Sequence, residues 1–458
     1  MEIDPDAIAC SISPSVARSD CAAAELREGG GVCGKRRAGS RPCGWLTMDN
    51  LLAGENIMQK WTQDEAIDFE CAREVITDLR AILATQIYEE SNKEQPDAEK
   101  LEQLYAESSR LFRERADLHV TDHENVMRVL ARYGAQVRVW RTENGASGER
   151  GAQRMSLNPD QYRLGEAEHQ AIFEQRIKPD LFADMPSPGQ PVAVIFGGQP
   201  GAGKSAAVDE AAKEISVRGG VVQIIGDDLR DYHPWYSRLM KADDKTAAFY
   251  TDRDTGRWVE KAIAEAKARR VNVVIEGTMR DGDKVAATMN SLHEAGYQID
   301  ARALAVTWCL SEQGILQRYE RQKHNRGAGR MTTPEAHQAA YAGMLQTLDR
   351  IEQEKLAERV TIYRRGAEAI YSNEVQNGQW VRKPQARVVV EAERARPMTL
   401  QEQQEYAKGL DDLAELLARP ERQASAGEIQ KIADLQRSAQ IAVAEALQQS
   451  RRMRNHRF

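Results

Sequence analysis

The sequence predicts an α/β protein, in which a parallel sheet is flanked by helices, with an N-terminal three-helix bundle and a helical C-terminal tail. Three observations predict this. Short β-branched runs alternate with longer amphipathic segments between residues 191 and 364, as in βαβ units. Before them, apolar residues recur at helical spacing from Thr62 to Gly134. After about Pro397 the chain is polar, with leucines at helical spacing.

Length and composition limit the classes of protein to consider. With 458 residues, the chain is long enough for two or three domains. Lys and Arg number 63 against 70 Asp and Glu, and the net charge of −7 does not favour a nucleic acid or an anionic membrane as partner. No apolar run approaches the roughly 20 residues that span a bilayer, and the first residues do not resemble a secretory signal. We therefore expect a cytoplasmic protein.

The first part of the chain differs in composition from the rest. Residues 11–44 are rich in Ser, Gly, Ala and Arg with little apolar periodicity, so residues 1–57 are expected to be a disordered leader. Four of the six cysteines lie in the first 43 residues, but no C-x-x-C pair occurs, and no zinc site is expected. Met48 and Met58 are alternative starts of the chain.

A helical bundle is expected over residues 58–140. The capping box Thr62–Glu65 begins its first helix, Pro96 and Asp97 begin the second, and Asp122 caps a third that Gly134 ends. Short connections between amphipathic helices favour an antiparallel bundle. No catalytic cluster is evident within it, so an interaction or regulatory domain is predicted.

The second folded domain is expected over residues 156–390, after a polar linker at 141–155 and before a C-terminal extension at 391–458. Its expected strands are 191–197, 220–225, 271–275, 301–308 and 359–364. Its expected helices are 204–217, 246–268, 282–295, 310–324 and 334–356. In such a sheet a ligand binds at the carboxyl ends of the strands, so the polar residues after each strand are the candidate site.

The first strand leads into a G-x-x-x-x-G-K-S motif. Between a strand and a helix this motif is a P-loop, whose glycines let backbone N–H groups surround phosphates. Lys204 can reach the β- and γ-phosphates and Ser205 can bind Mg²⁺. The motif therefore predicts a P-loop NTPase-like fold and nucleotide binding, the alternative being a glycine-rich turn alone. The predicted nucleotide-binding residues are Gly198, Gln199, Pro200, Gly201, Ala202, Gly203, Lys204 and Ser205.

Carboxylates follow the second and third strands. Asp227 is the candidate general base, provided that the second strand neighbours the first, and Asp228 points elsewhere if the backbone is extended there. Asp227 can instead be the N-cap of the following segment. Glu276 and Thr278 alternate on one side of an extended segment and can bind the hydroxyls of a polar acceptor, or Glu276 can pair with an arginine.

Basic residues follow the fourth strand. Arg318, Arg326 and Arg330 flank or end a glycine-containing turn that can close over a nucleotide and bring guanidinium groups to the γ-phosphate. The alternative is a solvated basic face.

Taken together, these motifs resemble those of the zeta toxins, the kinase toxins of epsilon/zeta toxin–antitoxin systems. The resemblance covers roughly residues 160 to 375. The motifs that carry it are Gly198-Gln-Pro-Gly-Ala-Gly-Lys-Ser205, Gly226-Asp-Asp-Leu-Arg230-x-x-His-Pro234, Glu276-Gly-Thr-Met-Arg280 and Arg318-Tyr-Glu with Arg330-Met-Thr-Thr-Pro-Glu.

The resemblance implies a kinase that uses ATP and Mg²⁺ to phosphorylate the 3′-hydroxyl of the amino sugar of UDP-N-acetylglucosamine, which blocks peptidoglycan synthesis. By the same resemblance, Lys204 and Ser205 serve ATP and Mg²⁺, and Asp227 is the base. Arg318 and Arg330 stabilise the transferring phosphoryl group. The implied substrate-binding residues are Asp227, Arg230, Glu260, Glu276, Thr278 and Arg280.

Two departures from the family pattern stand out. The usual Asp-Gly-Asp at the second strand reads Ile225-Gly226-Asp227 here. The spacing from Arg318 to Arg330 is one residue short, so Arg326 competes for the second arginine role. Both changes bear on the substrate rather than on the phosphate cradle.

Epsilon antitoxins are three-helix proteins that cover the ATP site of the toxin. By analogy, the N-terminal bundle is predicted to act as an antitoxin in cis, aided by the high effective concentration that a short linker gives. A stabilising or partner-binding domain is the alternative, and a separate antitoxin is a further candidate partner. For the whole protein, a kinase of another UDP-sugar, a nucleoside or a polynucleotide end, or a non-kinase nucleotide-dependent regulator, are the competing functions.

Overall fold

The computed structural model describes residues 60–145, 158–183 and 185–455 of the chain. The leader predicted at 1–57, and most of the linker predicted at 141–155, lie outside the described residues. The part of the linker that is described, up to residue 145, is helical. None of the helices in the described ranges combines the length and the apolar composition that crossing a membrane requires.

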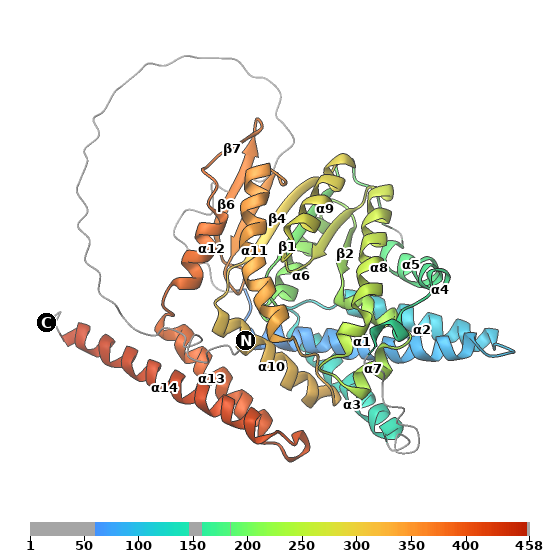
Figure 1. Ribbon diagram of the computed structural model, residues 1–458, viewed down its shortest axis with the longest axis horizontal. Helices are drawn as coiled ribbons and strands as arrows, with labels where there is room; N and C mark the ends of the chain where they lie inside the picture. Colours follow the sequence, from blue (N-terminus) through green and yellow to red (C-terminus); the bar gives the residue numbers. More distant parts are fainter. Residues whose placement is uncertain (1–59, 146–157, 184, 456–458) are drawn as a thin grey trace. The chain divides into compact units, whose positions relative to one another are not determined.

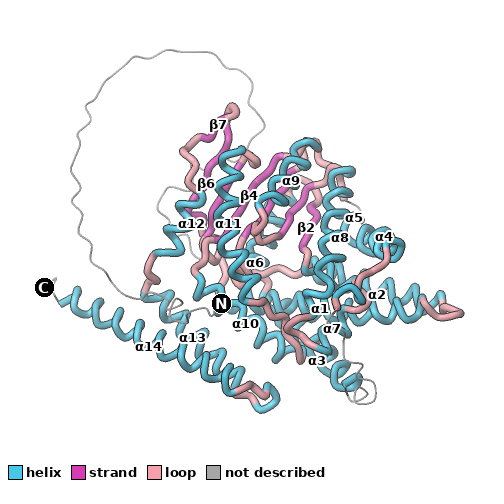
Figure 2. The backbone as a smooth tube through the Cα atoms, in the orientation of Figure 1, coloured by secondary structure: helices cyan, strands magenta, loops and turns pink. Residues whose placement is uncertain are grey.

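One mostly parallel sheet forms the centre of the described structure (Figure 2). Its strand order is β2-β3-β1-β4-β5-β6-β7, and the last two strands are antiparallel to their neighbours. The strands are β1 (Val192–Gly197), β2 (Val221–Ile225), β3 (Asn272–Glu276), β4 (Gln298–Leu304), β5 (Arg359–Tyr363), β6 (Ala369–Gln376) and β7 (Gln379–Trp380). The predicted α/β class is confirmed, as is the alternation of strands and helices from β1 to β5.

The sheet also departs from the sequence prediction in two places. The strand expected at 301–308 begins at Gln298 and ends at Leu304, because its register is set by pairing with both β1 and β5. The condition attached to Asp227, that the second strand neighbours the first, is not met, since β3 lies between β1 and β2. The antiparallel strands β6 and β7 were not predicted.

Helices cover the faces of the sheet (Figure 1). After the sheet begins they are α6 (Lys204–Ser216), η6 (Asp227–Tyr232), α7 (Tyr236–Ala242), α8 (Ala247–Arg269), α9 (Gly282–Glu294), α10 (Trp308–Arg326), α11 (Pro334–Glu354) and α12 (Ala386–Ala395). Before it come η4 (Pro159–Tyr162), α4 (Glu166–Ile172), the π-helical turn η5 (Phe173–Ile177) and α5 (Lys178–Phe182). Trp258, Met289 and Met344 are buried in the apolar cluster on one side of the sheet.

Three helices precede the sheet: α1 (Gln63–Ser91), α2 (Ala98–Ala116) and α3 (His123–Gly145). The predicted capping box is present, with the Thr62 side chain and the Glu65 backbone and side chain bonded reciprocally. The predicted end of the third helix at Gly134 is wrong. A Cβ at Gly134 would lie 2.7 Å from the carbonyl oxygen of Asn325, so this glycine permits close contact between α3 and the end of α10.

The first helix is part of the protein core. Of its 29 residues, 16 are buried. Phe69 and Val75 belong to the same apolar cluster as Val194 of β1 and Ala207 of α6. Helix α1 therefore packs onto the sheet and the helix after the P-loop, in addition to α2 and α3.

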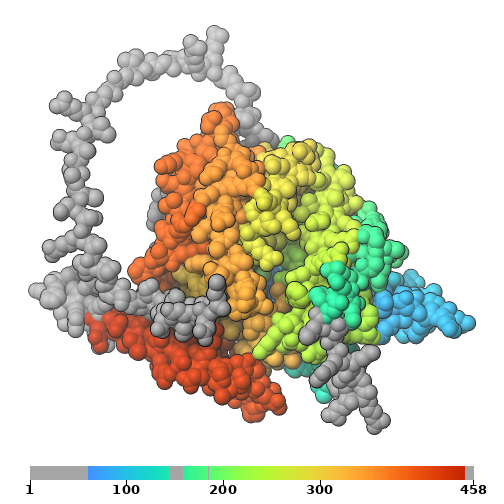
Figure 3. Space-filling model, in the orientation of Figure 1, coloured from blue at the N-terminus to red at the C-terminus, as the bar shows by residue number. Residues whose placement is uncertain are grey.

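The predicted helical tail consists of two helices, α13 (Leu400–Leu417) and α14 (Ala426–Asn455), with the single turn η7 (Pro420–Arg422) between them. Leu410, Leu413 and Ile432 form a small apolar cluster that joins them. The hairpin lies beside α10 in Figures 1 and 2, and its red surface in Figure 3 lies against the body of the protein. The tail is therefore packed, mainly against α10.

Candidate active site

The P-loop joins β1 to α6 and has the backbone that its glycines allow. Gly201 has a φ of 74°, and a Cβ there would lie 2.0 Å from the carbonyl oxygen of Ser311. Gly203 is left-handed and forms the N-cap of α6. Lys204 Nζ donates to the carbonyl of Gln199 at 3.3 Å and lies 3.8 Å from Glu276. The loop is therefore shaped to present backbone N–H groups and the N-terminus of a helix to an anion.

Two arginines from the later part of the chain support the P-loop. Arg394 of α12 donates to the side chain of Gln199 at 3.0 Å, and the same side chain donates to the carbonyl of Val306 at 2.8 Å. Arg365, after β5, donates to the carbonyl of Gly201 at 2.6 Å. Burial lowers the pKa of Arg365 to about 10. The sequence analysis did not identify these contacts, because nothing local links residues 365 and 394 to the loop.

A cavity of about 480 Å³ lies at the carboxyl ends of the strands and contains most of the predicted site. The predicted residues that line it are Pro200, Gly201, Gly203, Lys204, Ser205, Asp227, Arg230, Glu276, Thr278, Arg280, Arg318 and Arg330. Gly198, Gln199 and Ala202 are not among its lining residues. Glu260 is exposed and does not line it either; Val259, one residue earlier on α8, does. The strand-end rule thus located the cavity, whereas Glu260, which was assigned from the family resemblance, does not line it.

Asp227 lies between two arginines. Arg230 Nε donates to its Oδ1 at 3.1 Å, and Arg330 Nη1 donates to its Oδ2 at 2.5 Å. Burial alone would raise the pKa of Asp227, but Arg330 and then Arg230 outweigh it and hold the pKa below its usual range. The side chain is not an N-cap, because Gly226 holds that position. The carboxylate is thus ionised and accessible from the cavity.

The neighbouring carboxylate, Asp228, was expected to point elsewhere only if the backbone is extended, and this condition is not met. Residues 227–232 form the 3₁₀-helix η6 instead of an extended segment, and both Asp227 and Asp228 line the cavity. Asp228 forms an ion pair with Arg73 of α1.

Glu276, at the end of β3, faces the P-loop lysine and not an arginine. Burial raises the pKa of Glu276, Lys204 opposes this, and the nearby Asp227 adds to the rise. Glu276 and Thr278 both line the cavity, as their alternation predicted. The cavity therefore combines a phosphate cradle, several carboxylates and several guanidinium groups.

Helix α1 contributes side chains to this cavity that the sequence analysis did not identify. Glu70 Oε1 accepts a hydrogen bond from Ser205 Oγ at 3.0 Å, and Glu70 Oε2 lies 3.6 Å from Arg318. Glu74 Oε1 accepts from Arg330 Nε at 3.2 Å. Two carboxylates of one helix thus bind the P-loop serine and the two arginines predicted to serve the phosphoryl group.

The two candidates for the second arginine role have different positions. Arg330 lines the cavity, whereas Arg326 is fully buried beneath α1 and pairs with Asp78 at 2.6 Å and with Glu74 at 3.4 Å. Arg330 therefore has the access to the cavity that a phosphate-binding role requires.

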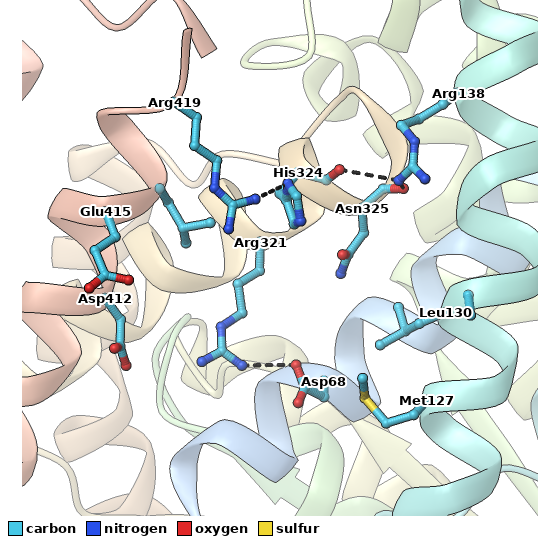
Figure 4. A pocket seen from close by; sticks show the side chains of 12 residues that line it. Asp68, Met127, Leu130, Arg138, Arg321, His324, Asn325, Asp412, Glu415 and Arg419 are labelled. Atoms are coloured by element: carbon cyan, nitrogen blue, oxygen red, sulfur yellow. Dashed lines mark hydrogen bonds and ion pairs between the residues drawn. The ribbon is translucent and has the colours of Figure 1, made fainter. Parts of the chain in front are cut away.

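Beyond the cavity, α1 is held to α10 by a further ion pair. Arg321 Nη1 lies 2.8 Å from Asp68, and Arg321 also pairs with Asp64. Figure 4 shows Arg321 pointing from α10 toward Asp68 at the floor of a second cavity, also of about 480 Å³, between α1, α3, α10 and α13. Burial raises the pKa of Asp68, against the opposing effect of Arg321.

A buried charge cluster joins the N-terminal helices to the loop that carries Asp227. Asp231 is fully buried and accepts from Arg80 Nε at 2.8 Å and from Arg115 Nη1 at 2.6 Å. Arg80 also lies 3.2 Å from Asp180 of α5. Removing one partner of such a cluster leaves an uncompensated buried charge, so α1 and α2 contribute to the stability of this loop.

The acidic residues of α1 do have a pattern in the sequence. Asp64, Asp68, Glu74 and Asp78 are spaced by four, six and four residues, which places them along one side of a helix. Such a row is usually a solvated face, and only the position of α10 and of the segment after it shows that arginines lie opposite.

We expect the substitution Asp78→Asn to lower the free energy of unfolding at pH 7 by about 2 kcal/mol, with a smaller loss in acid. Burial would raise the pKa of Asp78, but Arg326 and Arg141 outweigh it and lower the pKa. A lowered pKa in the folded state gives stability that is present above the unfolded pKa of about 4 and is lost as the pH falls through the folded pKa. Urea unfolding of wild type and variant at pH 7, 5 and 3 measures this difference.

The matched control is Asp283→Asn, which removes a carboxylate whose side chain is 92% exposed and pairs only with Arg350 among the described ion pairs. Its effect should stay within about 0.5 kcal/mol at every pH. A difference between Asp78→Asn and wild type that does not change with pH would contradict the assignment.

Comparisons with known proteins match the part of the chain that contains the P-loop. The family model for the zeta toxin matches residues 178–376. Toxin PezT of Streptococcus pneumoniae serotype 4 is 31% identical over 185 residues, which are 40% of this chain and 72% of that protein. The chain belongs to the zeta toxin family. Members of this family are toxin kinases, so the protein is assigned to the phosphotransferases.

Two further proteins are similar to parts of this chain. Toxin zeta of Enterococcus hirae is 28% identical over 207 residues, 44% of this chain and 72% of that protein. A solved structure of the PezAT chromosomal toxin–antitoxin system of Streptococcus pneumoniae aligns with 56% of this chain and 100% of its own chain, at 25% identity and a TM-score of 0.49. The matched residues do not include α1 to α3, α13 or α14, and of these helices α1, α3 and α13 pack against α10.

Proposed function

We propose that this zeta toxin family member is an ATP-dependent kinase that phosphorylates the 3′-hydroxyl of the amino sugar of UDP-N-acetylglucosamine and so inhibits peptidoglycan synthesis. We further propose that helix α1 holds it inactive. The observation that carries the proposal is the single cavity that contains Lys204, Asp227 and Arg330. These are a phosphate-binding cation, a candidate base and a cation for the transferring phosphoryl group.

In this proposal ATP binds to the P-loop, with Lys204 on its β- and γ-phosphates. Mg²⁺ would be held by Ser205 Oγ together with phosphate oxygens of ATP and water. Within the described ranges, no group of three or more His, Cys, Asp or Glu side chains is placed to hold a metal ion by itself. This fits Mg²⁺, which usually takes one or two protein ligands and substrate phosphates.

On the acceptor side, Asp227 accepts the proton of the sugar hydroxyl. Arg230, Glu276, Thr278 and Arg280 hold the rest of the sugar nucleotide, in line with the family resemblance and with their position around the cavity. Arg318 and Arg330 neutralise charge on the transferring phosphoryl group. We assign no role to Glu260, which is exposed outside the cavity.

Autoinhibition is supported by the contacts of α1. Glu70 bonds to Ser205 and approaches Arg318, and Glu74 bonds to Arg330, so carboxylates compete with the phosphates of ATP for the same donors. In this reading residues 58–140 are an antitoxin-like regulatory domain on the kinase domain of residues 156–390. A separate antitoxin, as in the PezAT system of the pneumococcal relative, is the alternative partner. A cytoplasmic location belongs to the same proposal, because ATP and the sugar nucleotide must both reach the cavity.

The test uses the full chain and its Glu70→Gln/Glu74→Gln variant, each incubated with ATP, Mg²⁺ and UDP-N-acetylglucosamine and followed by ³¹P NMR. We expect a new phosphomonoester signal that is much stronger with the variant. Transfer only to another UDP-sugar or to a nucleoside would overturn the acceptor and keep the kinase. ATP consumption that no acceptor accelerates would favour a nucleotide-dependent regulator, and equal transfer by the two proteins would overturn autoinhibition.

A further inference from the structure

Helix α10 carries Arg318 and is contacted on two sides. On one side lie α1 and the P-loop, where Arg318 faces the cavity. On the other side lies the C-terminal hairpin of α13 and α14, whose function neither the sequence nor the family match assigns. Successive residues of an α-helix are turned by about 100°, so Glu320 and Arg318 point about 200° apart, to opposite sides.

Two glutamines on the side of α10 that faces the hairpin form hydrogen bonds to the backbone of α13. Gln313 Nε2 donates to the carbonyl of Tyr406 at 2.6 Å, and Gln317 Nε2 donates to the carbonyl of Gly409 at 3.3 Å. Both glutamines are buried. A Cβ at Gly409 would lie 2.5 Å from Gln317 Nε2, so a glycine at this position of α13 allows the two helices to approach closely.

A bidentate ion pair also joins the hairpin to α10, at Glu320, two residues from Arg318. Arg422, between α13 and α14, donates from Nε to Glu320 Oε2 at 2.6 Å and from Nη2 to Glu320 Oε1 at 2.9 Å. Their side chains are only 10% and 6% exposed, and Arg422 also bonds to Glu428 of α14 at 2.8 Å. Bidentate pairs of this kind fix orientation as well as distance. The hairpin therefore holds α10 from the side opposite the cavity.

The contacts between the hairpin and α10 matter most when Glu70 of α1 no longer pairs with Arg318. Besides its ion pair with Glu70, Arg318 donates from Nη2 to Thr332 Oγ1 at 3.2 Å. Its Nε is buried and has no hydrogen-bond partner among the described residues. An unpaired buried donor that borders the cavity suits an anionic ligand. With Glu70 withdrawn, the backbone position of α10 decides where this guanidinium lies, and small displacements of such groups reduce rates strongly.

We propose that the C-terminal hairpin positions Arg318 for phosphoryl transfer, with Arg422 and Glu320 as positioning residues that act through α10. The inference rests on the proposed function, because it assigns the hairpin a role in the active kinase. It also accounts for a C-terminal extension of two helices whose buried polar contacts are concentrated on one helix of the kinase domain.

The test uses the full chain with the substitutions Glu70→Gln and Glu74→Gln, which we call the released chain because both carboxylates that compete with ATP are neutralised. It needs no acceptor. The probes are ADP with Mg²⁺, and the same mixture with aluminium fluoride, which imitates the transferring phosphoryl group. We expect Arg422→Gln to weaken the aluminium fluoride complex at least tenfold and to leave ADP affinity within about twofold, since transition-state mimics depend on the arginine and the nucleotide depends on the P-loop. Arg422→Lys, which keeps the charge but loses the two-pronged contact, should give an intermediate loss.

Two further variants separate positioning from loss of fold. Glu320→Gln breaks the same contact from α10 and should repeat the selective loss. Arg437→Gln is the control, because Arg437 is exposed and pairs with Asp434 of its own helix; it should change neither affinity. Where acceptor transfer is measured, the Arg422 variants should lower kcat with little change in KM for ATP.

The outcomes distinguish the two proposals. If the nucleotide binds but substitutions at Arg422 and Glu320 do not change the affinity for ADP with aluminium fluoride, the positioning inference is wrong and the kinase proposal stands. An equal loss of ADP and aluminium fluoride binding would also overturn the inference, because it would indicate a general effect on the fold. If the released chain binds no nucleotide, the proposed function fails and the inference fails with it.

Discussion

Replacing Glu70 and Glu74 together by glutamine in the full chain should raise its affinity for ATP by about tenfold to a hundredfold. Each carboxylate is ion-paired to a largely buried arginine, and Glu70 also occupies Ser205. Removing each charge weakens the closed arrangement by about 1.4 kcal/mol, a factor of ten in the competition with ATP phosphates. Calorimetric titration with a non-hydrolysable ATP analogue and Mg²⁺ measures the change.

The control makes the same change in net charge at a surface away from the cavity. Glu99→Gln/Glu102→Gln alters two exposed residues of α2 and should leave ATP affinity unchanged. An equal rise in both double variants would indicate a general electrostatic effect of net charge. No rise in the Glu70/Glu74 variant would show that α1 does not compete with the nucleotide.

Point substitutions test this competition better than deletion of the N-terminal helices. Deleting α1 to α3 would remove the two arginine partners of the buried Asp231 and uncover the apolar cluster that Phe69 and Val75 share with β1. Both losses are destabilising. An inactive deletion variant could therefore reflect a damaged fold, whereas glutamine substitutions preserve size and packing.

Replacing Asp227 by asparagine in the released chain should lower phosphoryl transfer by about a thousandfold and leave ATP affinity within about threefold. Asparagine preserves the shape of the side chain but cannot accept the proton of the attacking hydroxyl. The P-loop, which is proposed to bind the nucleotide, makes no described hydrogen bond to Asp227, whose partners are Arg230 and Arg330. Transfer rates followed by ³¹P NMR, together with calorimetric ATP affinity, measure the two effects separately.

Asp228→Asn is the matched control for this prediction. It neutralises the adjacent carboxylate, which pairs with Arg73 of α1 and also lines the cavity. Its effect on transfer should be much smaller than that of Asp227→Asn. Turnover retained by Asp227→Asn would show that Asp227 is not the base. A similar loss of transfer in both variants would indicate that the combined negative charge of Asp227 and Asp228 matters, and not a proton-accepting role of Asp227.

The elements that the sequence determined by itself depend on short-range chemistry. The β-branched run of β1, the glycines of the P-loop and the capping box at Thr62 act within a few residues, so spacing and residue type predict them directly. The rule that parallel strands end at one edge located the cavity through Asp227, Glu276 and Arg318, even though β3 lies between β1 and β2.

Only the tertiary structure decided which segments far apart in the sequence meet at that cavity. Glu70 and Ser205 are separated by 135 residues, and Arg365 reaches the P-loop from after β5. The same packing distinguishes Arg330, in the cavity, from Arg326, buried beneath α1, and gives Gly134 a contact where local rules predicted a helix end. The physical reason is that such contacts depend on which faces of helices and strands meet in space, and neither spacing nor local propensity encodes this.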